Sequence, residues 1–301
     1  MPGSEVSRPS DRVTLLRAAN PGPMTLEGTN TYLLAEPGAS EAVLLDPGPA
    51  LPEHLAAIEA AAAERDVRIA TVVLTHGHGD HSEAAPELAR RTGARVLAVD
   101  PAHRRGDEGL PDGSVLRVGG LELRVVATPG HSSDSVSLLL PAERAVLTGD
   151  TVLGRGTTVV AHPDGRLDDY LASLDRLGEL AGDLAVLHPG HGPALDDPRA
   201  AVEYYRGHRH RRLAAVRAAL DSIDATGAPV TALSVVAQVY SDVDPVLWPA
   251  AELSVRAQLE YLAVVEGRPA ARAALDAPPV GARDDTHVAR VDPSRLPAAP
   301  A

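Results

Sequence analysis

The segment from Thr75 to His81 limits most strongly what this chain can fold into, because it reads THGHGDH. Three histidines and one aspartate within six residues are hard to explain as an ordinary surface loop. Imidazole nitrogen and carboxylate oxygen are both ligands for zinc. The interleaved glycines let the backbone turn tightly, so that ligands close in sequence can converge. We therefore expect His76 and His78 to reach one ion, and Asp80 and His81 to point at a second.

The surroundings of this segment indicate a metal site built at the ends of strands. It follows a short apolar run, 70–75, typical of a buried strand, and it precedes a predicted helix at 82–91. Three further candidates, each preceded by glycine, come shortly after apolar runs: His131, Asp150 and His191. Each of them alone is more typical of a turn. Together with the first segment they supply five histidines and two aspartates, enough for two ions that share one carboxylate.

The composition restricts the remaining possibilities. The chain has 301 residues, of which 44% are hydrophobic, enough to bury a sizeable core. It has no cysteine, which excludes a disulfide partner, iron–sulfur clusters and thiol nucleophiles. All 28 basic residues are arginine, which excludes Schiff-base chemistry and a Walker lysine. The net charge of −13 argues against a nucleic-acid surface over the whole molecule, though not against a local basic patch.

Hydropathy predicts no membrane partner. No run of 18 apolar residues occurs, and the polar start of the chain does not resemble a signal peptide. We therefore expect a cytoplasmic protein.

Turn residues and hydrophobic periodicity divide the chain into four expected parts. Short apolar or alternating segments between Gly/Pro turns predict strands up to about residue 187, with helices between them, as in two sheets flanked by helices. The strands include 157–160 and 184–187, and helical spacing continues at 198–223, 231–240 and 246–266. The expected parts are a flexible N-terminus at 1–12, one domain at 13–196, a helical module at 197–268 and a disordered tail at 269–301.

The order of these motifs resembles the metallo-β-lactamase superfamily of binuclear hydrolases. Asp46, the cluster at 76–81, His131, Asp150 and His191 follow one another as the family's five motifs do. The resemblance covers about residues 13–195 and implies an α/β fold, an αββα sandwich with the metals at one edge.

The resemblance also implies a role for each ligand. The first metal would be held by His76, His78 and His131, and the second by Asp80, His81 and His191, with Asp150 bridging the two. The expected cofactor is two Zn²⁺ per chain, with Mn²⁺ or Fe²⁺ as alternatives. Binding between two zinc ions lowers the pKa of water from about 15.7 towards about 7. This would give a metal-bridging hydroxide as the nucleophile. Asp150 and Asp80 are the expected catalytic residues, Asp80 by carrying a proton to the leaving group.

A finer match concerns the branch of this family around β-lactamase-like protein 2. Segments that resemble this branch are 20–23, 28–32, 149–159, 204–209 and 254–267. The helical module then resembles a winged helix that covers the metal edge. The branch includes an endoribonuclease that cuts single-stranded RNA and acyl-carrier thioesterases. The first hypothesis is therefore an RNA phosphodiesterase. The alternative is a hydrolase of a thioester, ester or lactone, similar to glyoxalase II, and a non-catalytic binding protein is the third possibility.

Several residues are candidates for support of the metals or contact with substrate. Asp46 and Thr75 could fix the imidazole tautomers from behind. Asn30 could contact substrate, support the metal loop or simply form a turn. His208 and Arg209 lie in a segment, 204–217, with five arginines and no acid, which could be a basic face for phosphate or a solvated face whose arginine stems pack on the sandwich.

Two expectations rest on less specific grounds. His54 and His103 have no partners nearby in sequence and are expected at the surface. A dimer is expected on base rates alone.

Overall fold

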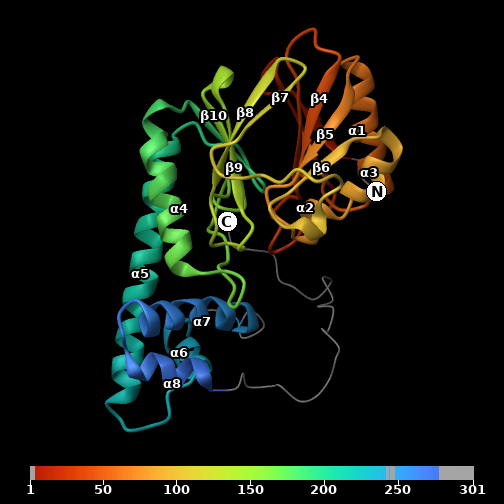
Figure 1. Ribbon diagram of the computed structural model, residues 1–301. Helices are drawn as coiled ribbons and strands as arrows, with labels where there is room; N and C mark the ends of the chain where they lie inside the picture. The colour runs from red at the N-terminus through yellow and green to blue at the C-terminus, as the bar shows by residue number, and fades with distance from the viewer. Residues whose placement is uncertain (1–3, 242–243, 245–247, 278–301) are drawn as a thin grey trace.

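The computed structural model of this chain describes residues 4–241, 244 and 248–277. Two β-sheets face each other, and helices cover the outer face of each (Figure 1). The first sheet has the strand order β1-β2-β3-β4-β5-β6, and the second has the order β11-β10-β9-β8-β7. The strands of the first sheet are β1 (Glu5–Ser7), β2 (Val13–Arg17), β3 (Asn30–Leu34), β4 (Glu41–Leu45), β5 (Arg68–Val73) and β6 (Arg95–Leu97). Those of the second are β7 (Val115–Val118), β8 (Leu121–Ala127), β9 (Val136–Leu140), β10 (Ala145–Gly149) and β11 (Val186–Pro189).

Two parallel pairings determine where polar side chains gather. The strands β4, β5 and β6 run parallel, and so do β10 and β11, whereas the other pairs within each sheet are antiparallel. The carboxyl ends of parallel neighbours lie at the same edge of a sheet. The loops that follow β4 and β5, and those that follow β10 and β11, therefore emerge side by side.

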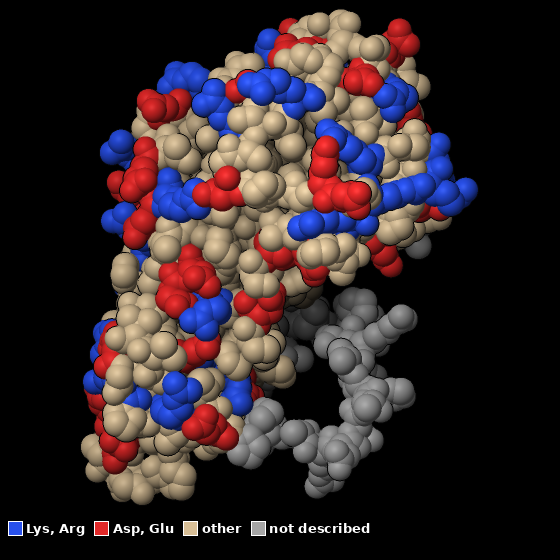
Figure 2. All heavy atoms as spheres, viewed as in Figure 1, with Lys and Arg blue, Asp and Glu red and all other residues tan. Residues whose placement is uncertain are grey.

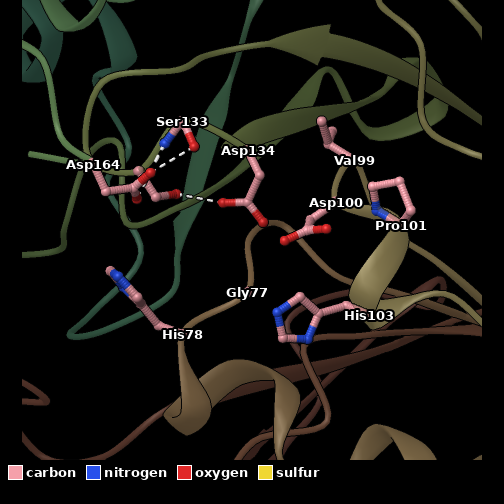
Figure 3. Close-up of a pocket in the computed structure, with 10 residues that line it drawn as sticks. Gly77, His78, Val99, Asp100, Pro101, His103, Ser133, Asp134 and Asp164 are labelled. Atoms are coloured by element: carbon pink, nitrogen blue, oxygen red, sulfur yellow. Dashed lines mark hydrogen bonds between the residues drawn. The ribbon is translucent and has the colours of Figure 1, made fainter.

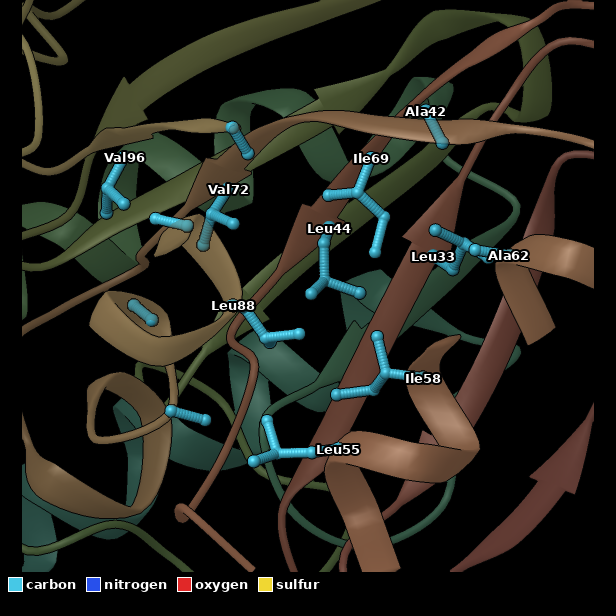
Figure 4. Close-up of a cluster of buried hydrophobic side chains, with 14 of the residues drawn as sticks. Leu33, Ala42, Leu44, Leu55, Ile58, Ala62, Ile69, Val72, Leu88 and Val96 are labelled. Atoms are coloured by element: carbon cyan, nitrogen blue, oxygen red, sulfur yellow. The ribbon is translucent and has the colours of Figure 1, made fainter. Parts of the chain in front are cut away.

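The strands at the centre of the first sheet are apolar on both faces because both faces are covered. Leu44 of β4 packs toward the helices α1 (Pro52–Glu64) and α3 (Ala85–Thr92), as Figure 4 shows, whereas Leu45 packs toward the second sheet. Alternate residues of a strand point to opposite faces, so a continuous apolar run marks a strand buried on both sides. This explains why apolar runs rather than alternating patterns mark these strands in the sequence.

The helical module extends from the sandwich along one long helix. That helix, α5 (Pro198–Asp224), packs beside α4 (Leu167–Leu180) on the second sheet and continues beyond it to α6 (Ala232–Val239), α7 (Trp248–Val264) and α8 (Pro269–Asp276) (Figure 1). Leu213, Val216, Val235, Val255 and Leu259 form the centre of the module's own apolar core. Three one-turn 3₁₀ helices, Pro101–His103, Pro141–Glu143 and Ala181–Asp183, complete the described elements.

The structure differs from the expectation at both ends of the chain. The N-terminal segment expected to be flexible contains β1, which pairs antiparallel with β2. The tail expected to be disordered begins with α8, where Ala271 and Ala274 are buried in the module core; residues 278–301 lie outside the described part. An alanine-rich helix offers little hydrophobic contrast for periodicity to detect.

Two predicted elements near the cluster also differ. The predicted helix at 82–91 is split into α2 (Gly79–Ser82) and α3, with Pro86 in the first turn of α3. Proline lacks an N–H and its ring clashes with the carbonyl four residues earlier, so one continuous helix is disfavoured there. The predicted strand 157–160 is an extended loop, and this loop contacts the functional site.

Candidate metal centre

The structure brings the seven predicted ligands together at one edge of the two sheets. Each follows the carboxyl end of a strand: the 76–81 cluster follows β5, His131 follows β8, Asp150 follows β10, and His191 follows β11. Within this edge, His76, His78 and His131 form one group. Nδ1 of His78 lies 3.0 Å from Nε2 of His76 and 3.0 Å from Nε2 of His131. Three imidazole nitrogens thus face a common point.

A second group lies beside the first. Nε2 of His191 lies 3.2 Å from Nε2 of His81 and 3.2 Å from Oδ2 of Asp80. Asp80 and His81 belong to the single turn α2, so the turn that follows Gly79 directs both side chains toward His191. The two groups together contain six of the seven residues that the family resemblance assigns to the two metals.

The carboxylate of Asp150 lies between the two groups. Its Oδ2 is 3.8 Å from Nε2 of His131 and 3.4 Å from Nε2 of His191, and its Oδ1 is 3.4 Å from Nε2 of His81. Oδ1 is buried and has no hydrogen-bond partner in the described structure. A Cβ atom on Gly190 would lie 2.5 Å from this oxygen, so glycine is required there. A buried carboxylate oxygen without a donor is costly unless a cation neutralises it, so the residues present fit a metal.

Two residues behind the cluster fix the tautomers of two imidazoles. Asp46 accepts hydrogen bonds from the Thr75 N–H and hydroxyl, both at 2.7 Å, and from Nδ1 of His81 at 3.0 Å. Since the Thr75 hydroxyl donates to Asp46, it accepts from Nδ1 of His76 at 3.0 Å. In the neutral form of each imidazole, Nε2 is therefore the nitrogen without a proton, and it faces the cluster. Asp46 holds this position in the left-handed region, with φ of 48°, and its three hydrogen bonds offset the strain.

Backbone carbonyls perform the same task for two more imidazoles. Nδ1 of His131 donates to the Val159 carbonyl at 2.7 Å, and Nδ1 of His191 donates to the Gly28 carbonyl at 3.2 Å. Donation from Nδ1 leaves Nε2 as the nitrogen available to a metal, and such outer contacts set ligand orientation and basicity. The Val159 contact comes from the loop at 157–160.

Asn30 supports the loop that carries His191. Its Nδ2 donates to the carbonyls of Pro189 and Gly192, at 2.9 and 2.8 Å, on either side of His191. Asn30 is 1% exposed and does not line the described cavities, so of the three roles considered for it, support of the metal loop is the one that its contacts fit.

The charges within the cluster shift the pKa values of its members. Burial opposes protonation of His191, but the Asp150 and Asp80 carboxylates outweigh it and raise the pKa of His191 to about 9. Burial likewise opposes ionisation of Asp150, but His81 and His191 hold the pKa of its carboxyl well below the usual range. Burial, reinforced by His81, holds the pKa of His76 well below its usual value. Protons on the second group thus balance the buried carboxylate, and metal binding would release them.

An apolar cavity of about 340 Å³ opens directly beside the cluster. Its polar floor is His78, Asp80, His131 and Asp150, and its walls include Met24, Leu26, Leu153, Val159, Ala250 and Leu253. Ala250 and Leu253 belong to α7, so the helical module supplies one wall. Among the described residues, no tyrosine or tryptophan lines this cavity, and the chain has no phenylalanine.

A second cavity, of about 530 Å³, lies on the other side of His78 and is acidic. Asp100, Asp134 and Asp164 line it together with His103 (Figure 3). Asp164 accepts a hydrogen bond from the Ser133 hydroxyl at 2.6 Å, and Asp134 accepts one from Ser132 at 2.7 Å. Among the described lining residues, the two cavities share His78 alone, so this side chain lies between an apolar space and a negatively charged one.

Four of the five arginines in the arginine-rich segment of α5 point inward or have a local partner. Arg209 is buried, 8% exposed, and its Nη2 donates to the Thr158 carbonyl at 2.5 Å. Arg206 pairs with Asp175, Arg217 pairs with Glu266, and the Arg212 guanidinium lies over the Tyr240 ring. His208 stacks on Tyr204 and lines none of the described cavities. The interpretation in which arginines of this helix pack inward or pair locally therefore fits these four arginines.

Sequence reasoning missed some residues that contribute to this site. His54, expected at the surface, is 1% exposed and donates through Nε2 to the Thr31 hydroxyl at 2.9 Å. The Tyr205 hydroxyl accepts from the Leu153 N–H at 2.8 Å and so fixes a wall of the apolar cavity. A signal for Arg209 did exist, because it lies between Tyr205 and Leu213 at a spacing of four residues, on the buried stripe of α5.

Comparison with known proteins agrees with this arrangement. Residues 24–191 match the family model of the metallo-beta-lactamase superfamily, and residues 231–267 match that of the beta-lactamase associated winged helix domain. The chain is 36% identical to "Beta-lactamase-like protein 2 homolog" of Caenorhabditis elegans over 245 residues, 79% of each chain. It is 37% identical to "Atrochrysone carboxyl ACP thioesterase" of Aspergillus fumigatus over 226 residues, 73% of this chain and 68% of the other.

Solved structures show the same fold. A metallo-beta-lactamase family protein from Thermus thermophilus superposes with a TM-score of 0.70 at 27% identity, over 86% of this chain and 95% of that one. A beta-lactamase domain protein from Burkholderia ambifaria superposes with a TM-score of 0.72 at 22% identity, over 87% and 89% of the two chains. The predicted two-sheet sandwich with a C-terminal winged helix is therefore confirmed. No helix in the described ranges is long and apolar enough to cross a membrane.

Proposed function

This chain belongs to the metallo-beta-lactamase superfamily and is a metal-dependent hydrolase, and we propose that it hydrolyses thioesters of apolar acyl groups. The observation that carries this proposal is the apolar cavity beside the cluster of metal-ligating side chains. A volume of about 340 Å³ is at the low end of about 300–1,000 Å³, the range of small-molecule sites, and suits an acyl group better than a polymer. The similarity to a carrier-protein thioesterase supports the same choice.

We assign two Zn²⁺ ions to the cluster, as the family resemblance implies. His76, His78 and His131 would hold one, Asp80, His81 and His191 the other, and Asp150 would contact both. Support comes from the unpartnered Oδ1 of Asp150 and from the imidazole nitrogens that face inward without protons. Such ions, when bound, polarise a carbonyl oxygen and lower the pKa of water to about 7.

The residues of the chain position the acyl group for attack. Met24 and Leu253 are 55% and 42% exposed and lie at the rim of the apolar cavity, so burying an acyl chain there covers side chains otherwise in water. Covering them also excludes water from the floor, where His131 and Asp150 lie. In low-dielectric surroundings, electrostatic interactions with the reacting carbonyl are stronger.

Asp80 is the residue that we expect to move the proton. It is half-buried, lines the cavity, and its Oδ2 lies 3.2 Å from Nε2 of His191. Attack of water forms the new carbon–oxygen bond, the carbon–sulfur bond breaks, and the electron pair leaves with sulfur. Asp80 accepts the proton lost by the water and passes it to the departing sulfur, so that acid and thiol are the products.

A phosphodiester substrate has less support. A phosphate chain that left the apolar cavity past His78 would meet the carboxylates of the acidic cavity. Arg209 is turned inward and cannot meet phosphate from solution. On the face shown in Figure 2, arginines alternate with acidic residues, without a continuous basic surface. A single-stranded nucleic-acid site usually combines a basic groove with aromatic platforms. Among the described residues that line the apolar cavity, there is no tyrosine or tryptophan, and the only arginine is Arg155, which pairs with Glu27.

A side-by-side assay tests the proposal. Zinc-loaded protein is given octanoyl-N-acetylcysteamine, bis-p-nitrophenyl phosphate and single-stranded RNA, and thiol release is followed with Ellman's reagent. The chain has no cysteine and so gives no background with this reagent. We expect thioester turnover that is lost in Asp150→Asn and kept in Asp175→Asn, which changes an exposed carboxylate of α4. Cleavage of RNA without thioester turnover would refute the proposal.

A further inference from the structure

Arg209 is an arginine inside the protein without an acidic partner. It is 8% exposed, and none of the carboxylates in the described residues forms an ion pair with it. Its Nε is buried and has no hydrogen-bond partner within the described structure. Burying a charge without a counter-ion is costly. The contacts of Arg209 should therefore show why a buried arginine is present at this position.

The guanidinium of Arg209 contacts two segments of the sandwich. Nη2 donates to the carbonyl of Thr158, in the extended loop that was expected to be a strand. The guanidinium carbon lies 4.9 Å from the centre of the Tyr170 ring, at the start of α4, a distance suited to a cation–π contact. The long helix α5 is thus tied at one residue to the loop and to α4.

Both of these segments hold the same imidazole. In the loop, the Thr158 hydroxyl lies 2.9 Å from Nδ1 of His131, and the Val159 carbonyl accepts from the same nitrogen at 2.7 Å. On the other side, Gly130, which precedes His131, packs closely against the backbone of Tyr170. A Cβ atom added to Gly130 would lie 2.3 Å from Cα of Tyr170. Arg209 therefore touches the two supports that determine where His131 points.

We propose that Arg209 is a positioning residue for His131, and that through it the helical module orients a metal ligand of the sandwich. This inference rests on the metal assignment of the proposed function but not on its substrate. Holding the Thr158 carbonyl fixes the loop that accepts from Nδ1, and so directs Nε2 toward His76 and His78. Outer contacts of this kind commonly change metal affinity by about 10–100-fold when they are removed.

Arg209→Met tests the proposal, because methionine keeps much of the apolar stem and removes the charge and the donor. Arg206→Met is the matched control, since Arg206 lies three residues earlier on α5 and is exposed beside Asp175. Zn²⁺ dissociation is followed by competition with a chromogenic chelator, and the geometry of the site by the visible spectrum of Co²⁺-substituted protein. We expect one of the two ions of Arg209→Met to bind at least about 10-fold more weakly, with an altered Co²⁺ spectrum, and Arg206→Met to behave as the wild type.

A purely structural role predicts a different result. If Arg209→Met lowers the melting temperature but keeps both Zn²⁺ affinities and the Co²⁺ spectrum, the proposal is overturned. If this variant does not fold, Arg209→Lys and Thr158→Val replace it. Lysine keeps the charge but lacks the planar fork, and valine removes only the hydroxyl near His131; wild-type zinc affinity in both would also overturn the proposal. A wild-type protein that binds no zinc would instead contradict the metal assignment itself.

Discussion

Removal of the Asn30 side chain should destabilise the loop of His191 by a predictable amount. Asn30→Ala deletes two buried hydrogen bonds, to the carbonyls of Pro189 and Gly192. The Pro189 carbonyl keeps a second donor, the Tyr32 hydroxyl at 2.7 Å, whereas no other donor to the Gly192 carbonyl is found in the described residues. Each lost bond costs about 0.5–1.5 kcal/mol, and an orphaned buried acceptor about 1–3 kcal/mol. The unpartnered Oδ1 of Asn30, which the variant also removes, offsets part of this loss.

The expected total is about 2–4 kcal/mol, measured as the difference in the free energy of unfolding by urea. At about 2–4 °C per kcal/mol, the melting temperature should fall by roughly 4–16 °C. Tyr32→Phe is the graded comparison, since it removes one bond and leaves the Pro189 carbonyl with Asn30. It should cost only about 0.5–1.5 kcal/mol. Zinc bound by the group that contains His191 should weaken about 10-fold in Asn30→Ala. Equal losses in the two variants, with unchanged zinc affinity, would refute this account of Asn30.

Three further predictions concern other parts of the molecule. Burial lowers the pKa of His54 to about 4, below its value of about 6.5 in the unfolded chain. The free energy of unfolding should therefore be highest above about pH 6.5 and fall by roughly 3 kcal/mol as the pH drops to 4. In His54→Gln, the free energy of unfolding by urea should lack this dependence on pH, and the same dependence in both proteins would contradict the prediction. Leu253→Trp should narrow the apolar cavity and lower kcat/KM for octanoyl relative to acetyl thioesters about 10-fold at an unchanged melting temperature; an unchanged ratio would place the acyl chain elsewhere. If the acyl group fills the apolar cavity, we expect the departing thiol to extend past His78 toward the acidic cavity. Thioesters of the cation thiocholine should then be preferred about 5–10-fold over those of the anion mercaptoethanesulfonate, and Asp134→Asn with Asp164→Asn should reduce this preference. A preference for the anion would mean that the leaving group does not meet the acidic cavity.

The ligand cluster could be predicted from sequence because the neighbouring residues in the sequence mark each ligand. Histidines and aspartates beside glycine, each just after an apolar run, place polar side chains at strand ends, and parallel neighbours bring those ends together. The sandwich was predictable for a related reason, since continuous apolar runs such as β5 mark strands covered on both faces. The family resemblance added the pairing of ligands with two metals, which the spacing alone leaves open.

The supports of the cluster could not be predicted, because they depend on contacts distant in sequence. Residues 157–160 have the β-branched composition of a strand, yet they form a loop whose Val159 carbonyl holds His131. His54 looked isolated in sequence, but the folded chain brings Ser4 and Thr31 to its two ring nitrogens. Arg209 looked like part of a basic face because charge patterning does not distinguish an inward arginine from an outward one.

Metal content and turnover measured on one sample test the central claim most directly. Protein loaded with zinc and freed of excess metal is analysed by plasma mass spectrometry, and the same sample is assayed with octanoyl-N-acetylcysteamine. We expect two zinc ions per chain and thioester hydrolysis in the wild type. In His78→Ala, the zinc content should fall and hydrolysis should be lost together. Full hydrolysis by wild-type protein that holds no metal, or by His78→Ala that holds no metal, would contradict a metal-dependent mechanism.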